Sequence, residues 1–249
     1  MPLHFLLDGA AGALPEDSWA ARPGDAVTLT GQEAHHAAAV RRVRVGEEVT
    51  VGDGRGAWLT GECEAVSPKE VVVRITRRDD IPAPSPRLVL VQALAKGDRD
   101  ELAVQAATEL GVAGVIPWAA ERSVSRWEGA KVARGEERWR SIVREAAKQA
   151  IRPRVPEVAS LASTAQLAAL DGLVIVLEPT AEVPLTGVAV DGVDRITLVV
   201  GPEGGVSPRE LDRLGESGAV AARLGPEVLR TSTAGPAALA VLNARLARW

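Results

Sequence analysis

The sequence predicts a two-part chain in which a small N-terminal β barrel precedes an α/β domain with a mostly parallel sheet. Three observations support this prediction. Short apolar runs separated by turn residues fill positions 1–78, a charged and proline-rich segment follows at 79–86, and strand-like runs alternate with helical patterns from Arg87 onward. We therefore expect a barrel at 1–78, a linker at 79–86 and an α/β domain at 87–249.

The barrel is expected to hold five short strands and one helix. The helix is placed at 33–40, and the strands at 4–7, 26–30, 48–51, 57–65 and 70–76. Asp53-Gly54 lies between two strand-like runs and indicates a hairpin. The glycines at 52, 54 and 56 are therefore interpreted as turn residues, because no helix follows them to supply an anion site.

The second part should alternate strands with helices. We expect strands at 88–94, 115–118, 173–177, 196–200 and 219–224. One helix should begin at Asp98 and end at Gly111, with Leu102, Ala106 and Leu110 on its buried face. A long basic helix should span 127–149 and continue toward Arg152 and Arg154.

The last helix contains a proline that bears on where it begins. Proline is tolerated in the first helical turn, so Pro236 predicts Thr233 as the N-cap and leaves Thr231 and Ser232 in the preceding loop. Its apolar face is formed by Ala238, Leu239, Leu242 and Leu246. That face fits either core packing or a subunit interface.

Composition excludes several classes of protein. Hydrophobic residues make up 46% and charged residues 25%, which is typical of a soluble globular protein, and no apolar run is long enough to span a membrane. Residues 1–8 lack the pattern of a secretory signal, so we expect a cytoplasmic protein that does not bind membranes. Cys63 is the single cysteine and the three histidines lack ligand spacing, so we expect no metal.

The stretch from Leu198 to Glu210 is the most informative in the chain. An apolar strand ends at Gly201-Pro202, two glycines follow, and Ser207 with Glu210 forms a capping box at the start of a helix. In an open α/β sheet such a loop lies at the carboxyl end of a strand, where ligands bind. A ligand pocket and a simple tight turn both fit these residues.

A second loop at 224–231 also follows a strand and should face the first across one crevice. Backbone N–H and C=O groups dominate both loops, which suits a ligand held by its adenine edge and ribose. Neither a phosphate-binding P-loop nor a dinucleotide fingerprint is present in the sequence. ATPase and NAD-dependent functions are therefore disfavoured.

Together these motifs resemble the paired signature of the ribosomal RNA small-subunit methyltransferase E family, which belongs to the SPOUT class. The resemblance rests on the residues from Leu198 to Ser207 with Glu210, on Leu224-Gly225, and on Val228 to Thr231. Further matches lie at 92–97, 107–111, 121–123 and 144–152, and in the N-terminal part at His36, 40–43 and Asp53-Gly54. The resemblance covers nearly the whole chain.

This resemblance implies a fold, a cofactor and partners. It implies a SPOUT-type parallel sheet with a C-terminal trefoil knot, a PUA-like barrel at 1–78 that helps to hold RNA, and a methyltransferase domain at 87–249. It also implies a homodimer that uses S-adenosyl-L-methionine to methylate N3 of a uridine in 16S ribosomal RNA of the small subunit (30S particle). RNA rather than DNA is the expected partner.

The resemblance also implies contacts for individual residues. For the cofactor these are Leu177, Glu178, Gly201, Pro202, Gly204, Leu224, Gly225, Val228 and Leu229. For RNA they are Arg41, Arg42, Arg44, Arg122, Arg126 and Arg152, although the cluster at 41–44 fits a solvated charged face equally well.

Two side chains are candidates for catalysis. Arg230 is expected to stabilise negative charge that develops on the uracil oxygens, and Glu203 to bind the cofactor or orient the loop. For each a structural role is also open: Glu203 can pair with a nearby arginine, and Arg230 can cap carbonyl groups.

The sequence differs from the family pattern at three places. His4 stands where the family usually has an arginine, Val206 replaces a common phenylalanine, and Gly235-Pro236 replaces helix-forming residues. Two other functions remain open: methylation of a ribose 2′-hydroxyl, and a non-catalytic RNA-binding protein that serves ribosome assembly.

Overall fold

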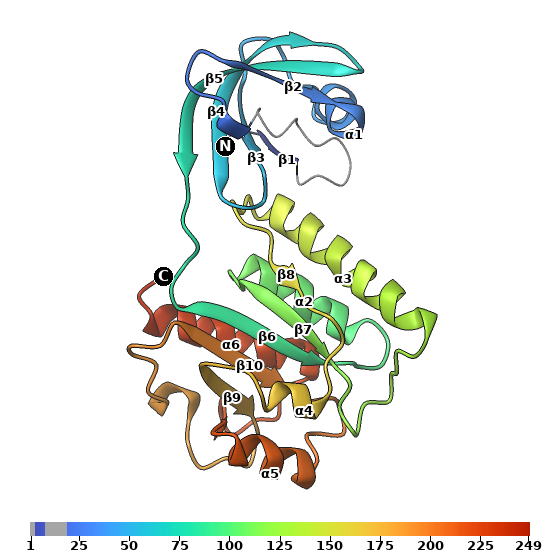
Figure 1. The fold of residues 1–249 in the computed structure, drawn as a ribbon, viewed down its shortest axis with the longest axis vertical. Coiled ribbons are helices and arrows are strands. Elements are labelled where there is room, and N and C mark those ends of the chain that lie inside the picture. The colour runs from blue at the N-terminus through green and yellow to red at the C-terminus, as the bar shows by residue number, and fades with distance from the viewer. Residues whose placement is uncertain (1–2, 8–18) are drawn as a thin grey trace. The chain divides into compact units, whose positions relative to one another are not determined.

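The computed structural model describes residues 3–7 and 19–249 (Figure 1). Met1, Pro2 and Asp8, which belong to the segment interpreted as lacking a signal sequence, lie outside this range. The chain forms two compact units: unit 1 consists of residues 1–83 and 147–155, and unit 2 of residues 84–146 and 156–249. Unit 1 therefore takes in a short segment, 147–155, that the sequence placed in the second part.

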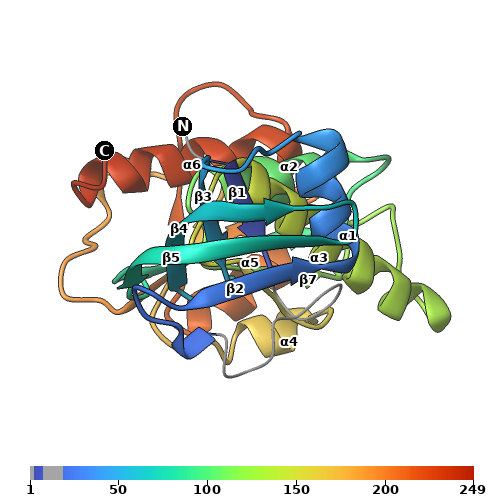
Figure 2. The same cartoon turned by 90° about the horizontal axis from the view of Figure 1, so that it is seen from above.

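Unit 1 is built on a curled five-stranded sheet of order β1-β3-β4-β5-β2. The strands are β1 (Leu3–Leu6), β2 (Ala26–Thr30), β3 (Glu48–Gly52), β4 (Ala57–Val66) and β5 (Glu70–Asp80). β1 pairs with β3 in parallel, and the other pairs are antiparallel. Figure 2 shows β5 lying between β4 and β2. All five expected strands are thus confirmed.

One face of this sheet is apolar because strand residues alternate between its two sides. Phe5, Val49, Leu59 and Val73 point inward and are buried in a single core. α1 (Gly31–His35) packs beside β2 and continues into a π-helical turn, η2 (His36–Val40). The expected helix at 33–40 is therefore present but consists of two helical types.

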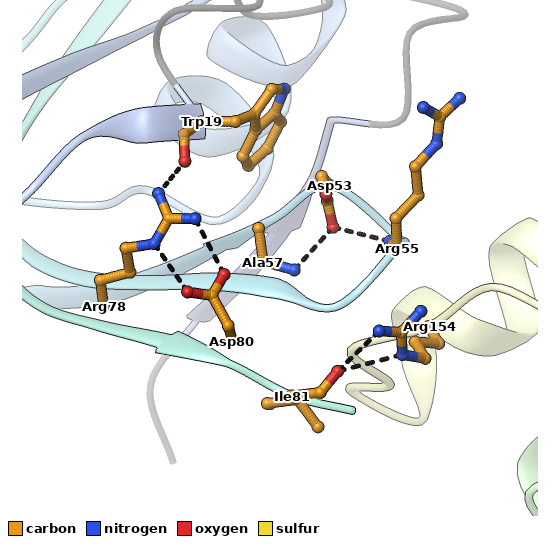
Figure 3. A network of polar contacts seen from close by, with 8 residues as sticks. All are labelled: Trp19, Asp53, Arg55, Ala57, Arg78, Asp80, Ile81 and Arg154. Carbon is orange, nitrogen blue, oxygen red and sulfur yellow. Dashed lines mark hydrogen bonds and ion pairs between the residues drawn. The ribbon is translucent and has the colours of Figure 1, made fainter. Parts of the chain in front are cut away.

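The hairpin between β3 and β4 has the expected turn chemistry. The Oδ1 atom of Asp53 accepts hydrogen bonds from the backbone N–H groups of Arg55 (2.6 Å) and Ala57 (3.0 Å), as Figure 3 shows. Gly56 has φ +114°, and a Cβ there would lie 2.4 Å from the carbonyl oxygen of Ile81. Gly54, at φ +69°, and Gly56 serve the turn as predicted, whereas Gly52 is the last residue of β3.

β5 is longer than the sequence indicated. It continues through Asp80, which pairs with Ala57 of β4, so residues 79 and 80 of the expected linker belong to a strand. Within this extension Arg78 binds Asp80 through two hydrogen bonds and also donates to the carbonyl of Trp19 (Figure 3). These contacts outweigh the weak strand preference of charged residues.

Unit 2 is a six-stranded sheet of order β11-β9-β10-β6-β7-β8 in which every pair is parallel. Its strands are β6 (Arg87–Ala93), β7 (Gly114–Trp118), β8 (Glu157–Val158), β9 (Leu173–Leu177), β10 (Arg195–Val200) and β11 (Val220–Ala222). The predicted parallel sheet is confirmed, and β8 is the strand that the sequence did not reveal. A two-residue strand leaves no periodic pattern to detect.

Helices cover both faces of this sheet. α4 (Thr164–Leu167) and α5 (Pro208–Glu216) lie on one face, where Leu167 and Leu214 join the core formed by β6, β9 and β10. α2 (Arg99–Glu109) and α6 (Thr231–Arg245) pack against each other and against β6. A short 3₁₀ turn, η3 (Leu185–Gly187), also contacts α6.

The buried face of α2 is not the predicted one. Leu102 is 50% exposed, whereas Ala103, Val104, Ala107 and Thr108 are buried. Small side chains let α2 approach α6 and the sheet closely, so the row of small residues, rather than the leucine row, faces inward.

The basic helix α3 (Ala130–Gln149) begins three residues later than expected and ends before Arg152 and Arg154. Trp127 lies outside it and packs edge-to-face on Trp139, with ring centroids 5.5 Å apart. Residues 147–149 at the C-terminal end of this helix, together with the following residues up to 155, belong to unit 1.

The start of α6 was predicted incorrectly. The N-cap is Arg230 rather than Thr233, and Pro236 lies inside the helix. The prediction assumed that a proline must lie in the first turn. Instead the helix begins at Thr231, whose side chain is held by tertiary hydrogen bonds described below.

Within the part of the chain that the structure describes, no helix has both the length and the apolar character needed to cross a lipid bilayer.

Candidate functional site

Unit 2 contains a cavity of about 430 Å³ at the carboxyl ends of β9, β10 and β11. This is the edge at which parallel α/β sheets bind ligands. The loop after β10 and the loop before α6 both line the cavity, as the sequence predicted. Its volume lies in the usual range for small-molecule sites.

Most of the predicted cofactor and catalytic residues line this cavity. They are Leu177, Glu178, Gly201, Pro202, Glu203, Leu224, Gly225, Val228, Leu229 and Arg230. The sequence interpretation did not assign several other lining residues, which include Arg99, Pro179, Val200, Val206, Ala222, Arg223, Glu227, Thr231 and Ala234. Of these, Arg99 lies just after Lys96-Gly97 of the loop that follows β6. Its position after a strand of the parallel sheet could have identified it as a cavity residue from the sequence.

The glycine loop after β10 turns sharply. The N–H of Gly205, at φ +72°, donates to the carbonyl oxygen of Pro202 over 2.9 Å. A Cβ on Gly201 would lie 2.8 Å from Cγ2 of Val206, so only glycine fits there without displacement of a neighbour. The loop is therefore both a tight turn and a wall of the cavity, and the two interpretations of its sequence do not exclude each other.

Glu210 fixes the far end of this loop. The predicted capping box is present: Oε2 of Glu210 accepts from the N–H of Ser207 (3.1 Å), whose Oγ accepts from the N–H of Glu210 (3.2 Å). Oε1 of Glu210 also accepts from the N–H of Glu121 (2.9 Å) and from Oγ1 of Thr164 (2.9 Å). One buried carboxylate thus joins three segments of unit 2.

Thr231 connects the two loops that line the cavity. Its Oγ1 donates to the carbonyl oxygen of Gly201 (2.8 Å) and accepts from Nε2 of Gln92 on β6 (2.8 Å). Gln92 is fully buried, and its Oε1 has no hydrogen-bond partner among the described residues. The relay fixes the first turn of α6 against the glycine loop.

The carboxylate of Glu203 is already paired. Its Oε1 accepts from the N–H of Lys96 (3.0 Å) and from Nη1 of Arg99 (2.9 Å). Burial by itself would raise the pKa of Glu203, but hydrogen bonds from its own backbone, from Lys96 and from Arg99 lower the pKa below its ordinary value. Of the alternatives that the sequence left open, the structure contains the pairing with an arginine.

Arg230 and Gly204 differ in their relation to the cavity. Arg230, the N-cap of α6, is exposed and lines the cavity. Gly204, which we expected to contact the cofactor, is not among the lining residues. Its carbonyl instead accepts from Nη1 of Arg122 (3.1 Å), and a Cβ on Gly204 would lie 3.2 Å from Cβ of Arg122.

The six arginines predicted to contact RNA divide between the two units. Arg41, Arg42 and Arg44 are exposed in unit 1 after η2, and Arg122 and Arg126 are exposed in unit 2. Arg152 belongs to unit 1 and is only half-exposed, and burial lowers the pKa of its guanidinium to about 10. The described residues contain no group of three His, Cys, Asp or Glu side chains that could hold a metal ion.

Two family descriptions match the sequence. An RNA methyltransferase domain matches residues 82–243, and an RNA methyltransferase PUA domain matches residues 29–76. The first match alone covers more than half of the chain.

Curated relatives and solved structures agree with these matches. Ribosomal RNA small subunit methyltransferase E of Mycobacterium bovis is 41% identical over 233 residues, which are 91% of this chain and 89% of the relative. The Bacillus subtilis protein of the same name is 32% identical over 230 residues, 87% of this chain and 89% of the relative.

A structure of the Neisseria gonorrhoeae protein of this name, bound to S-adenosyl methionine, superposes with a TM-score of 0.82. Its sequence is 26% identical, and the match covers 98% of each chain. The parallel sheet, the paired loops and these matches lead to one conclusion: the chain belongs to the ribosomal RNA small subunit methyltransferase E family, with a SPOUT-type domain and a PUA-type domain.

Proposed function

We propose that the protein transfers a methyl group from S-adenosyl-L-methionine to N3 of a uridine in 16S ribosomal RNA. The observation that carries this proposal is that the loops at 201–205 and 224–231 line the same cavity, in a chain of this family. The protein would act in the cytoplasm, as a homodimer and on the assembled 30S particle.

The cavity fits the cofactor on its own features. Gly201 and Gly225 line the cavity without side chains, which allows an adenine edge to approach the backbone closely, and Leu177, Val228 and Leu229 provide apolar side chains. Bound there, the cofactor supplies an electrophilic methyl group on a sulfonium. The C-terminal trefoil knot that the family resemblance implies is part of this proposal.

The side chains of the cavity suggest catalysis by positioning. Methyl transfer requires N3, the methyl carbon and sulfur in line, so the geometry of the loops matters most. Arg230 would stabilise negative charge on the uracil oxygens as N3 loses its proton, and its presence in the cavity lining supports this role. Glu203, with its lowered pKa and its contact with Arg99, orients the loop rather than accepting the proton.

RNA binding is proposed for the exposed arginines of both units. The residues that would contact phosphates are Arg41, Arg42 and Arg44 in unit 1, Arg122 and Arg126 in unit 2, and the partly buried Arg152; exposure of the first five supports this role. Binding through phosphates predicts that affinity falls as salt concentration rises.

Primer extension tests the proposed reaction. Purified protein and S-adenosyl-L-methionine are incubated with 30S subunits that lack the modification, and the 16S rRNA is then reverse transcribed. Methylation at N3 removes a pairing edge of uracil, so we expect one new stop. A methylated nucleoside without a stop would instead indicate the ribose 2′-hydroxyl, and nucleoside mass spectrometry separates these outcomes. Cofactor binding without methyl transfer would contradict the proposal.

A further inference from the structure

Unit 1 contains a groove of about 600 Å³ on the face of its sheet opposite the core. Because Val49, Val51 and Leu59 point into the core, their alternate neighbours on β3 and β4 point to the other side. The groove is lined by Glu48, Thr50, Trp58, Thr60, Arg77, Gln149, Ala150 and Ile151. All of them belong to unit 1, so the groove is distinct from the cavity of unit 2.

Residues 149–151 form one wall of the groove, and hydrogen bonds of the residues on either side hold this segment in place. Nζ of Lys148 binds both carboxylate oxygens of Glu33, at 2.8 and 3.0 Å. Beyond the wall, Nη2 and Nε of Arg154 donate to the carbonyl oxygen of Ile81 at 2.8 and 3.1 Å, as Figure 3 shows. The segment at 149–151 is therefore fixed on the sheet before any ligand arrives, which reduces the entropy lost on binding.

The floor of the groove offers an aromatic ring. Trp58 is half-buried and stacks on His4, with ring centroids 4.2 Å apart and planes at 9°. Nδ1 of His4 and Oγ1 of Thr50 lie 3.0 Å apart in a hydrogen bond, which fixes the imidazole and with it the indole. A preorganised ring of this kind can stack with another flat ring.

The floor also holds an unsatisfied polar atom. Thr60 is 7% exposed, and its Oγ1 has no hydrogen-bond partner among the described residues. Buried hydroxyls without a partner are uncommon, because leaving one unpaired costs free energy. In the sheet, Thr60 lies opposite Thr50 of β3 on one side and opposite Arg77 of β5 on the other. The unpaired hydroxyl therefore lies between two polar neighbours.

The charges at the edge of the groove argue against a phosphate in its interior. Glu48 places a carboxylate there, which repels anions and accepts hydrogen bonds from amino groups. Nε of Arg77 is 2.8 Å from Oδ2 of Asp79, so its charge is partly neutralised. A flat, uncharged ring with both donors and acceptors matches this set of groups better than an anion does.

We infer that this groove binds one unpaired nucleobase of the RNA substrate, stacked against Trp58 and hydrogen-bonded to Thr60, as a contact separate from the methylated uridine. The inference rests on the proposed action on RNA. Proteins that recognise unpaired RNA stack bases on aromatic side chains and bind base edges through hydrogen bonds.

Binding of a labelled cytidine heptamer to the full-length protein, followed by fluorescence anisotropy, tests this inference. Trp58→Leu should weaken binding by about 5- to 160-fold, the range for loss of one stacked base. Trp58→Phe keeps an aromatic face and should retain most of the affinity. If Trp58→Leu is folded and binds as tightly as the wild type, the inference is wrong.

Thr60 gives a second test that does not depend on the tryptophan. Thr60→Val has nearly the same shape and removes only an unpaired hydroxyl, so the fold should be preserved. Thr60→Val should weaken heptamer binding, whereas Thr60→Ser keeps the hydroxyl and should bind about as tightly as the wild type. Thr28→Val, on the edge strand β2 and outside the groove lining, is the matched control and should bind as the wild type does. Equal affinity of all three variants would overturn the inference.

Methyl transfer to 30S subunits separates this inference from the proposed function. We expect Trp58→Leu to raise KM for the particle and to leave kcat unchanged. Methyl transfer by the wild type together with unchanged heptamer binding by the variants would refute the groove alone. No transfer by the wild type, with heptamer binding lost in the variants, would refute the function alone. A loss confined to 30S particles, with protein-free 16S rRNA bound normally, would make the occupant a protein and overturn the inference.

Discussion

At the scale of single residues, Arg230 combines exposure with a place in the wall of the cavity. Neighbouring Thr231 is held by Gly201 and Gln92, so the backbone that carries the arginine is fixed on one side. A cation on a fixed backbone can act on charge that develops during a reaction without reorganisation of the site.

Replacement of Arg230 by alanine should therefore lower kcat by about 100-fold, the usual effect of removing one charge-stabilising donor. The dissociation constant for S-adenosyl-L-methionine should change little, and calorimetry measures it. Arg209→Ala is the control, because Arg209 is exposed on α5 and is not among the residues that line the cavity. A kcat close to the wild-type value would contradict the proposed role.

His4 makes unit 1 sensitive to acid. Burial, assisted by the positive charge of Lys148, lowers the pKa of His4 from 6.5 to about 4. The unfolded chain therefore takes up this proton at higher pH than the folded chain. The contribution of neutral His4 to the free energy of unfolding is fully present above pH 6.5. It is lost as the pH falls through about 4, and the total loss is about 3 kcal/mol.

Urea denaturation at several pH values checks this expectation. His4→Phe keeps an aromatic ring against Trp58 and cannot titrate, so its free energy of unfolding should fall less steeply between pH 6.5 and 4. Parallel curves for the variant and the wild type would show that His4 is not responsible.

At the scale of elements, the sequence predicted the strands and the apolar face of α6 well but missed the buried face of α2. β9 was placed at its exact bounds, since Leu173 to Leu177 is an unbroken apolar run between turn residues. The buried face of α2 was missed because the choice between its leucine row and its alanine row depends on the neighbouring α6. Periodicity identifies a helix, but packing partners determine which side is buried.

The loop after β10 shows the same division for the site. Its glycines and the capping box of Ser207 and Glu210 could be predicted from local sequence. The bonds from Glu210 to Glu121 and Thr164 could not, because they join residues 89 and 46 positions apart.

Glu210→Gln should destabilise this loop. A glutamine side chain has one acceptor oxygen, whereas Glu210 uses both oxygens to accept hydrogen bonds. We expect a loss of about 1–3 kcal/mol in the free energy of unfolding, together with weaker cofactor binding. Glu216→Gln, at the exposed end of α5, is the control for removal of a charge. Unchanged stability would show that the shared carboxylate is dispensable.

Pro236 should cost α6 stability. As an interior residue it has no N–H to donate to the carbonyl four positions earlier. Pro236→Ala should therefore raise the free energy of unfolding by about 1–3 kcal/mol, as measured in urea. A decrease would mean that the ring of Pro236 contributes packing that outweighs the missing hydrogen bond.

At the scale of the whole molecule, two units with separate cores carry separate binding features. The cavity lies in unit 2 and the groove in unit 1. The sequence indicated two parts, but the assignment of residues 147–155 to unit 1 depends on long-range contacts such as Lys148 with Glu33, 115 positions apart. Local patterns carry no information about such contacts.

Hydrogen exchange with and without S-adenosyl-L-methionine should distinguish the units. A ligand that binds only the folded state stabilises it by about 2.7 kcal/mol at 100 times its Kd. Protection should therefore increase around 201–205 and 224–231, while the strands of unit 1 exchange at unchanged rates. Equal increases in both units would contradict a cofactor site confined to unit 2.

Because residues 147–155 belong to unit 1, the chain passes between the two units at 83/84, 146/147 and 155/156. A protease that cuts within 81–86 would not release unit 1 as one piece, since Lys148 and Arg154 would remain on the other fragment. A gene truncated at that point would likewise encode the sheet without the segment that covers it. Unit 1 is therefore not one continuous stretch of the sequence, and moving residues 1–83 alone into another protein would leave residues 147–155 behind.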